Sequence, residues 1–164
     1  MEVVKAPNPT KADTFYKMFL AGSIEMGAAE NWQDKATDYF KDFPNLTIFN
    51  PRRDDWDSSW VQEITNPQFK EQVDWELDHL FRSNVIIFYF DPNTKSPITL
   101  LELGLILGRD MFHDADIYVC CPPGFWRRGN VEIVCERYGL EIFTDLNSVL
   151  TKIKDDIDLE NLLG

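Results

Sequence analysis

The sequence predicts an α/β protein built on one doubly wound sheet of five parallel strands, and two observations lead to this class. Short apolar runs alternate with longer amphipathic stretches along the 164 residues, which is the order that repeated strand–helix–strand units require. One of these runs, residues 84–90 (NVIIFYF), is apolar almost throughout, as expected of a central parallel strand that is covered on both faces.

The first half of the chain supplies two predicted strands and two predicted helices. Strands are expected over residues 15–21 and 46–49, and helices over residues 29–43 and 66–82. Gly22 and Ser23 close the first strand, and Pro67 suits the first turn of the second helix. The segment between the second strand and that helix, residues 50–65, is rich in charge and tryptophan and is predicted to be a long loop.

The second half of the chain continues the alternation. Strands are expected over residues 84–90, 115–121 and 140–143, and helices over residues 98–109, 131–138 and 146–157. Asn130 and Asp145 are the expected N-caps of the last two helices. With right-handed crossovers, five strands and five helices form a flavodoxin-like or Rossmann-like layer structure.

The length fits one domain, expected over residues 14–164, preceded by a flexible arm over residues 1–13. That arm is polar and proline-bearing, without the basic start and apolar stretch of a signal peptide. No apolar run is long enough to span a membrane. These features predict a cytoplasmic protein with no membrane partner.

The charge and the metal-binding residue types narrow the partners. A net charge of −12 repels nucleic-acid backbones, so polymeric nucleic acid is not an expected partner, although a small anion held in a local pocket remains possible. The three cysteines and two histidines show no CxxC or HExxH spacing, so no metal site is expected. The first loop lacks GxGxxG, which argues against a dinucleotide cofactor.

Ligands of such folds bind beyond the carboxyl ends of the strands, so the loops that follow the first four strands are expected to carry function. In the first loop, Gly22, Ser23 and Ile24 either form a plain turn or let a ligand approach the backbone. In the second loop, the candidates are Asn50, Arg52, Asp54 and Trp56. The Arg52 guanidinium can donate paired hydrogen bonds to a ligand, Asn50 and Asp54 can accept them, and Trp56 offers a flat ring. The same residues would also suit a solvated loop held by internal ion pairs.

Glu102 is the most informative single residue. Its neighbours along the helix, including Leu100, Leu101, Leu103 and Leu105, are apolar, so the helix is expected to be buried nearly all round. A lone carboxylate there is costly unless it is satisfied or used. Burial raises its pKa and the start of the helix lowers it. An ionised, partly desolvated carboxylate is a good nucleophile for an anomeric carbon.

Several short motifs together resemble the nucleoside 2-deoxyribosyltransferase family, over roughly residues 19–142. They are FLAGSI at 19–24, NPRR at 50–53, Q-x-x-WEL at 72–77, SPI at 96–98 and LELG at 101–104. None of these motifs is specific alone, and their combination carries the resemblance.

The resemblance implies a double displacement without metal or organic cofactor. Glu102 would attack C1′ of a nucleoside, the base would leave, and a second free nucleobase would take its place with retained configuration. Glu76 matches an acidic residue that contacts the base and could protonate the leaving nitrogen. The family also implies a homo-oligomer with shared active sites. The 122–130 loop, with Trp126 and Asn130, is the expected contribution to a neighbour's site.

Two positions depart from the transferase pattern. Phe19 stands where many members have a tyrosine that orients the nucleophile, and Tyr16 and Tyr89 are candidate replacements. Ser96 stands where transferases commonly have an aspartate for the 5′-hydroxyl, a role that Asp91 could take instead. A serine there is similar to the deoxynucleoside 5′-monophosphate N-glycosidases, where it helps to hold a phosphate.

Three hypotheses therefore stand after the sequence. The first is base exchange between nucleosides, the second is hydrolysis of nucleoside monophosphates with the same nucleophile, and the third is a non-catalytic nucleotide-binding module.

Overall fold

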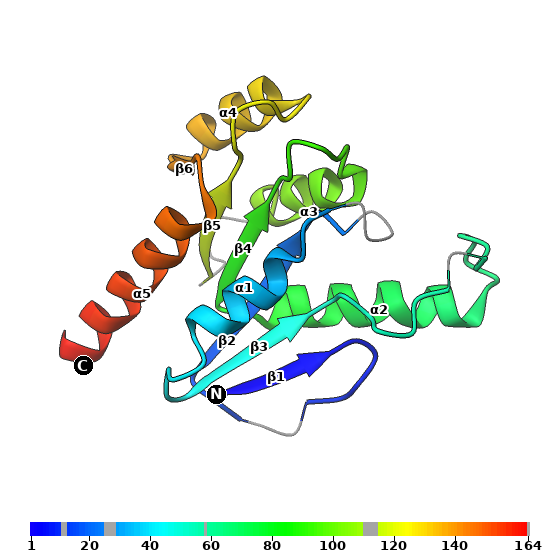
Figure 1. The fold of residues 1–164 in the computed structure, drawn as a ribbon, viewed down its shortest axis with the longest axis horizontal. Helices are drawn as coiled ribbons and strands as arrows, with labels where there is room; N and C mark the ends of the chain where they lie inside the picture. The colour runs from blue at the N-terminus through cyan, green and yellow to red at the C-terminus, as the bar shows by residue number, and fades with distance from the viewer. Residues whose placement is uncertain (11–12, 25–28, 58, 110–114, 164) are drawn as a thin grey trace.

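A computed structural model describes residues 1–10, 13–24, 29–57, 59–109 and 115–163. Within these residues, six parallel strands form one sheet in the order β1-β3-β2-β4-β5-β6 (Figure 1). The strands are β1 (Glu2–Lys5), β2 (Tyr16–Gly22), β3 (Leu46–Asn50), β4 (Val85–Tyr89), β5 (Asp116–Cys120) and β6 (Ile142–Phe143). The predicted doubly wound parallel α/β class is confirmed.

Helices cover both faces of the sheet. They are α1 (Trp32–Tyr39), α2 (Pro67–Arg82), α3 (Pro97–Leu107), α4 (Arg128–Arg137) and α5 (Leu146–Leu163). Buried side chains of α1 and α5 share one core cluster, whereas those of α2, α3 and α4 share the other. The molecule is therefore a three-layer sandwich, and α2 and α3 lie on the same face.

The central strands are apolar on both sides because each side faces a helical layer. On β4, Ile86 and Phe88 belong to the α2–α3–α4 cluster, whereas Val85 and Ile87 belong to the α1–α5 cluster. The same alternation runs along β2 and β5. The side-chain period of two thus divides each apolar run between two cores.

The prediction of five strands and a flexible arm over residues 1–13 is wrong at Glu2–Lys5, which forms β1. This strand pairs in parallel with β3, with Lys5 opposite Asn50, at the edge of the sheet away from β6 (Figure 1). Four residues at an edge carry little periodic signal, so the pairing that stabilises β1 is not visible locally. Residues 11–12 of the predicted arm lie outside the described residues.

The predicted boundaries need three corrections. The first helix is shorter than predicted, because Asn31 caps it by accepting from Asp34 N (3.4 Å). The fourth helix, α4, begins at Arg128, so Asn130 lies inside this helix and is not its N-cap. There, the Arg128 guanidinium donates to Cys121 O (3.0 Å) and holds the start of the helix at the end of β5. The fifth continues beyond 157 to Leu163.

The Asp145 cap is confirmed, because its Oδ1 accepts from Ser148 N at 2.9 Å. Among the residues that the structure describes, no helix combines the length and the apolar character needed to cross a bilayer.

Candidate functional site

The site lies where the strand order reverses. The chain passes from β2 outward to β3 and then returns to β4 on the other side of β2. Loops that follow β2 and β4 therefore diverge at the carboxyl edge of the sheet, which is where ligands bind in open α/β sheets. Ser23 follows β2, Asp91 follows β4, and α3, whose N-cap is Ser96, carries Glu102.

A buried cluster of hydroxyl groups joins these two loops. Ser23 Oγ accepts from Thr94 Oγ1 (2.9 Å) and from the backbone N–H of Asp91 (2.9 Å). Ser96 Oγ is hydrogen-bonded to Ser23 Oγ and lies 2.8 Å from Thr94 Oγ1. These side-chain hydrogen bonds join the loops after β2 and β4, in addition to the backbone bond from Ser23 N to Tyr89 O (3.0 Å).

Asp91 braces the same junction. Its Oδ2 accepts from the backbone N–H of Glu30 (3.1 Å), just before α1, and its Oδ1 accepts from Asn93 N (2.8 Å). The carboxylate is buried. It therefore joins the approach to α1 to the loop after β4, which places it close to the hydroxyl cluster.

Gly22 is required by close packing. A Cβ on this residue would lie 2.6 Å from Trp32 Cζ2 and 2.7 Å from the carbonyl oxygen of Tyr89. The Trp32 indole also donates to Ser23 O (3.2 Å). The sequence left two interpretations of Gly22, a plain turn or a close approach of a ligand to the backbone. In the structure, the groups that approach the backbone closely are Trp32 and the Tyr89 carbonyl.

Ser96 occupies a strained position at the N-cap of α3. Its φ of 45° and ψ of 52° lie in the left-handed region, which non-glycine residues seldom adopt. The hydroxyl is turned into the cluster with Ser23 and Thr94 and makes no cap hydrogen bond to α3. Strain of this kind persists only where the surroundings impose it, and it is common at functional sites.

Glu102 is the buried carboxyl of this region, with only 8% of its surface exposed. Burial, and to a smaller extent the negative charge of Glu76, raise the pKa of Glu102 to about 8. The opposing effect of the helix start is weak because Glu102 lies in the second turn of α3, and that effect fades beyond the first turn. In the part of the chain that the structure describes, its carboxyl has no hydrogen-bond partner.

Glu76 on α2 is the second carboxyl. Burial raises its pKa to about 7, although a hydrogen bond from Gln72 acts in the opposite direction. Gln72 Nε2 donates to Glu76 Oε1 (2.7 Å) and to Pro51 O (2.9 Å). The structure therefore brings the two predicted catalytic carboxyl groups within electrostatic range, although one lies on α2 and the other on α3.

Neither candidate tyrosine replaces the hydroxyl that Phe19 lacks. Tyr16 lies at the start of β2, at the opposite edge of the sheet, and its hydroxyl donates to Glu160 (3.2 Å). Tyr89 belongs to the α1–α5 core and its ring packs on Trp32 at 5.1 Å. Phe19 itself is buried on the side of α2, with its ring 6.4 Å from that of Trp75.

The loop after β3 is held by internal contacts. Asn50 Oδ1 accepts from Arg52 N (2.9 Å), and Asp54 forms a surface ion pair with Lys5 (2.7 Å). Arg52 reaches Gln33 Oε1 of α1 at 3.4 Å. Trp56 packs on Trp60, and its indole nitrogen is buried without a hydrogen-bond partner among the described residues.

Arg53 has the same structural character. Its side chain is 5% exposed, pairs with Asp55 and Glu71, and lies over the Trp60 ring. Of the two interpretations of this loop, the one based on internal ion pairs describes Arg53 and Asp54, whereas Arg52 forms no ion pair among the described residues and contacts Gln33 instead.

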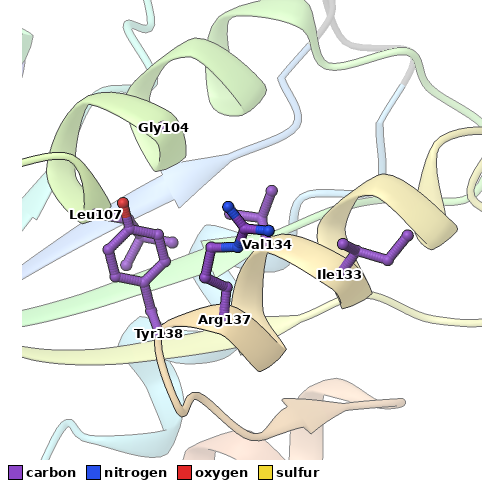
Figure 2. Close-up of a pocket in the computed structure, with 6 residues that line it drawn as sticks. All are labelled: Gly104, Leu107, Ile133, Val134, Arg137 and Tyr138. Atoms are coloured by element: carbon purple, nitrogen blue, oxygen red, sulfur yellow. The ribbon is translucent and has the colours of Figure 1, made fainter.

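Asn130 is exposed on α4 and lies away from Glu102. It lines a groove between α3 and α4 together with Leu103 and Gly104. A neighbouring hollow of about 290 Å³ continues along the same two helices. Figure 2 shows Arg137 and Tyr138 projecting there from α4 toward the end of α3, where Leu107 lies. Gly104 is two residues from Glu102, so the hollow opens on roughly the opposite side of α3.

The 122–130 loop contacts its own chain. Trp126 Nε1 donates to Lys95 O (3.0 Å), beside Ser96, and Arg127 covers the exposed indole. Ile24 is partly exposed at the open end of the first loop; residues 25–28 of that loop lie outside the described residues. Across the described ranges, no three His, Cys, Asp or Glu side chains gather as metal ligands would.

Two contributors were not predicted from the sequence. Thr94 completes the hydroxyl cluster, and Gln33, a fully buried residue of α1, contacts Arg52. A glutamine on the apolar face of an amphipathic helix is a signal that could have identified Gln33. No local pattern marks Thr94, because its partner Ser23 is 71 residues away.

The chain matches a known protein family over much of its length. A family model described as "Nucleoside 2-deoxyribosyltransferase like" matches residues 15–125, which is more than half of the chain. The matched segment contains β2 to β5, and so it includes both carboxyl groups and the hydroxyl cluster. No curated protein matches the chain significantly.

Proposed function

Because the chain belongs to the nucleoside 2-deoxyribosyltransferase-like family, we propose that it is an enzyme that exchanges the base of (deoxy)nucleosides through a covalent intermediate on Glu102. The observation that carries this proposal is the pair of carboxyl groups, buried Glu102 and partly buried Glu76, near the point where the strand order reverses. Retaining glycosidic chemistry needs two such groups, one as nucleophile and one as acid and base.

The reaction uses one proton and two carboxyl groups. An oxygen of ionised Glu102 attacks C1′ while the C1′–N bond breaks. The electron pair of the C1′–N bond passes to the nitrogen of the departing base. Protonated Glu76 gives its proton to that nitrogen. A second base then attacks C1′ through nitrogen and returns a proton to Glu76. The ester C1′–O bond breaks, and the Glu102 carboxylate is regenerated.

The pKa values of the pair suit this exchange. With values of about 7 for Glu76 and about 8 for Glu102, the two groups together hold one proton slightly above neutral pH. Without a bound base, this proton resides mainly on Glu102, which has the higher pKa. A bound base that presents an acceptor nitrogen to Glu76 would draw it there, which leaves Glu102 ionised at the moment of attack.

The hydroxyl cluster and its neighbours are proposed to line the sugar. Ser23, Asp91 and Ser96 form the rigid junction beside α3, and Ile24 continues it. Gly22 and Asn50 contribute shape, because both are committed to packing or to turn formation. Arg52 and Trp56 are proposed base contacts, since both lie in the loop beside α2.

A nucleoside fits these contacts better than a nucleoside monophosphate. The Ser96 hydroxyl is engaged with Ser23 and Thr94, and Arg53 is engaged with Asp55 and Glu71. A phosphate would have to compete with these partners. Hydrolysis of nucleoside monophosphates with the same nucleophile is therefore the second candidate, supported by the serine at position 96 and by Arg52.

The test is chromatography of reactions that separate the candidates. Purified protein is incubated with 2′-deoxyinosine plus adenine and, separately, with 2′-deoxyguanosine monophosphate. Formation of 2′-deoxyadenosine, lost in Glu102→Ala and kept in the surface control Glu136→Ala, supports the transferase. Free guanine from the monophosphate without any exchange product supports the hydrolase and overturns base exchange.

A separate experiment identifies the nucleophile. A 2′-fluoro nucleoside slows breakdown of the glycosyl ester, so the sugar should remain on the protein and be located by peptide mass spectrometry. Attachment to Glu102 distinguishes an enzyme from a binding module. Ligand binding without label or turnover in wild type would favour the module.

A homo-oligomer, with one copy contributing to its neighbour's site, is part of this proposal. Three apolar residues of the outer face of α3, Ile98, Leu101 and Leu105, are 58%, 66% and 41% exposed. Copies that each carry a charge of −12 repel one another. An uncharged apolar face is the kind of surface through which they could still associate.

A further inference from the structure

The N-terminal segment Glu2–Asn8 lies outside the matched family segment and yet contacts two elements of the site. Its strand β1 runs parallel to β3, and just beyond it the backbone N–H of Ala6 donates to Asn50 O (3.2 Å). Because Asn50 is the last residue of β3, the N-terminal segment fixes the point at which the loop after β3 begins.

One chain of hydrogen bonds leads from this point to the proposed acid. The residue after Asn50 is Pro51, whose carbonyl accepts from Gln72 Nε2 at 2.9 Å. The other N–H of the same amide is available to Glu76 Oε1, 2.7 Å away. A carboxamide whose nitrogen is held at the loop cannot rotate freely, so it presents its second N–H to Glu76 in one direction.

A second connection reaches the neighbouring residue of α2. The Trp75 indole donates to the carbonyl oxygen of Asn8 (2.9 Å). The same side chain is buried in the cluster that contains Val4 and Ala6 of the N-terminal segment, and its ring stacks on His79 at 4.0 Å. The turn of α2 that carries Glu76 is therefore held to the segment both by an indole hydrogen bond and by packing.

We propose that Glu2–Asn8 is a positioning element for the acid: through Gln72 and Trp75 it holds Glu76 in a fixed place and orientation on α2. The inference rests on the proposed function, because it gives a reason for fixing Glu76. Nothing in the segment needs to touch the substrate. Loss of either connection allows Glu76 to adopt orientations from which it cannot transfer its proton to the base.

The two connections predict opposite changes in the titration of Glu76. Trp75→Phe removes the indole N–H and keeps an aromatic ring, so α2 is released from Asn8 and water reaches Glu76. Since burial is the main cause of the raised pKa of Glu76, that pKa should fall. Gln72→Met keeps the length of the side chain but removes the donor that favours the carboxylate, so the pKa should rise. Glu102 of α3, a titratable group that interacts with Glu76, is unchanged in both variants.

The titration is measured by carboxyl ¹³C NMR and needs no substrate. Tyr118→Phe is the control, because it removes a side-chain hydrogen bond to Asp156 (2.9 Å) in the opposite layer of the molecule. It should lower the thermal midpoint and leave the titration of Glu76 unchanged. If Trp75→Phe and Gln72→Met also leave it unchanged, the segment is merely structural and the proposal is overturned.

Base exchange provides the second measurement. In both variants kcat should fall by about tenfold, the effect of one lost hydrogen bond in a transition state, with KM nearly unchanged. When release of the first base is followed in a single turnover, the loss should disappear with an N7-methylated purine nucleoside, whose base is already cationic and leaves without a proton. A persisting loss would overturn the role of the segment. Absence of exchange in wild type would instead overturn the proposed function, and with it the role of Glu76 as an acid.

Discussion

Glu76 on α2, which is partly buried, lies near enough to buried Glu102 on α3 for its negative charge to oppose the ionisation of Glu102. Glu76 loses its proton first, at a pKa of about 7, and Glu102 follows at about 8. Each group alone could be a buried side chain with a disfavoured charge. Together they form a unit that holds one proton between these two values, which is the state that the proposed double displacement requires.

The pH dependence of base exchange follows from this pair. Below about pH 7 both carboxyl groups hold protons, so there is no nucleophile; above about pH 8 both are ionised, so the departing base receives no proton. The profile of kcat/KM should therefore be bell-shaped with its maximum between these values. It is measured with 2′-deoxyinosine and adenine across pH 5 to 10, a range chosen to extend about two units beyond both values.

Glu76→Gln is the matched variant for this profile. It removes both the acid and the charge that raises the pKa of Glu102. The alkaline limb should therefore vanish, the acidic limb should remain because Glu76 is already uncharged at that pH in wild type, and the maximal rate should fall by about 100-fold. A bell that survives this substitution would show that another group is the acid.

Stability should respond to Glu102 in the same range of pH. The pKa of Glu102 rises from an ordinary value of 4.5 to about 8 on folding, so the ionised form is disfavoured in the folded protein. This penalty is absent below pH 4.5, grows between the two values, and is complete above about pH 8. Glu102→Gln avoids it, so the variant should match wild type at pH 4.5 and melt several degrees higher at pH 9.

Calorimetry at the two pH values tests this expectation. Since each pH unit of pKa shift corresponds to about 1.4 kcal/mol, the gain at pH 9 should be clear. The exposed Glu136→Gln should show no such gain. A Glu102→Gln variant that is no more stable than wild type at pH 9 would mean that Glu102 ionises without penalty in the folded protein.

The sequence predicted the fold class because its strongest signal, the doubly apolar run that forms β4, follows from burial on both faces. It did not predict β1, because four edge residues acquire their strand conformation from pairing with β3, which lies 45 positions later in the chain. Both carboxyl groups were predicted, Glu102 from the cost of its apolar surroundings and Glu76 from the resemblance. The hydroxyl cluster was not, because contacts such as Ser23 with Thr94 leave no periodic trace.

The strained backbone of Ser96 gives a further test. Ser96→Ala removes the hydroxyl and leaves Ser23 and Thr94 short of a partner, while it keeps a Cβ at a φ of 45°. Ser96→Gly removes the same hydroxyl but relieves the backbone. The glycine variant should therefore be more stable than the alanine variant by about 1 kcal/mol, and both should be less stable than wild type. Urea unfolding measures the difference, and an alanine variant as stable as wild type would contradict it.

Gly22 offers a prediction with a matched control. In Gly22→Ala the new methyl would lie under 3 Å from both Trp32 and the Tyr89 carbonyl, so the loss of stability should exceed about 2 kcal/mol, as for other overpacked sites. Gly129 lies in α4 with no atom within 4 Å of its Cβ position. Gly129→Ala should therefore raise stability by about 0.5–1 kcal/mol. Equal effects of the two substitutions in urea unfolding would contradict the packing described around Trp32.

The apolar outer face of α3 makes self-association testable. Ile98, Leu101 and Leu105 share this face because they are spaced by three and four residues. Sedimentation velocity of wild type should therefore show a dimer or a larger assembly, and Leu101→Asp should yield a monomer because it places charges on a face that two acidic copies must share. Leu159→Asp changes a leucine of similar exposure on α5 and should leave the assembly intact. If the Leu101→Asp monomer is folded but inactive, the site depends on the neighbouring copy; if it is fully active, each copy carries a complete site.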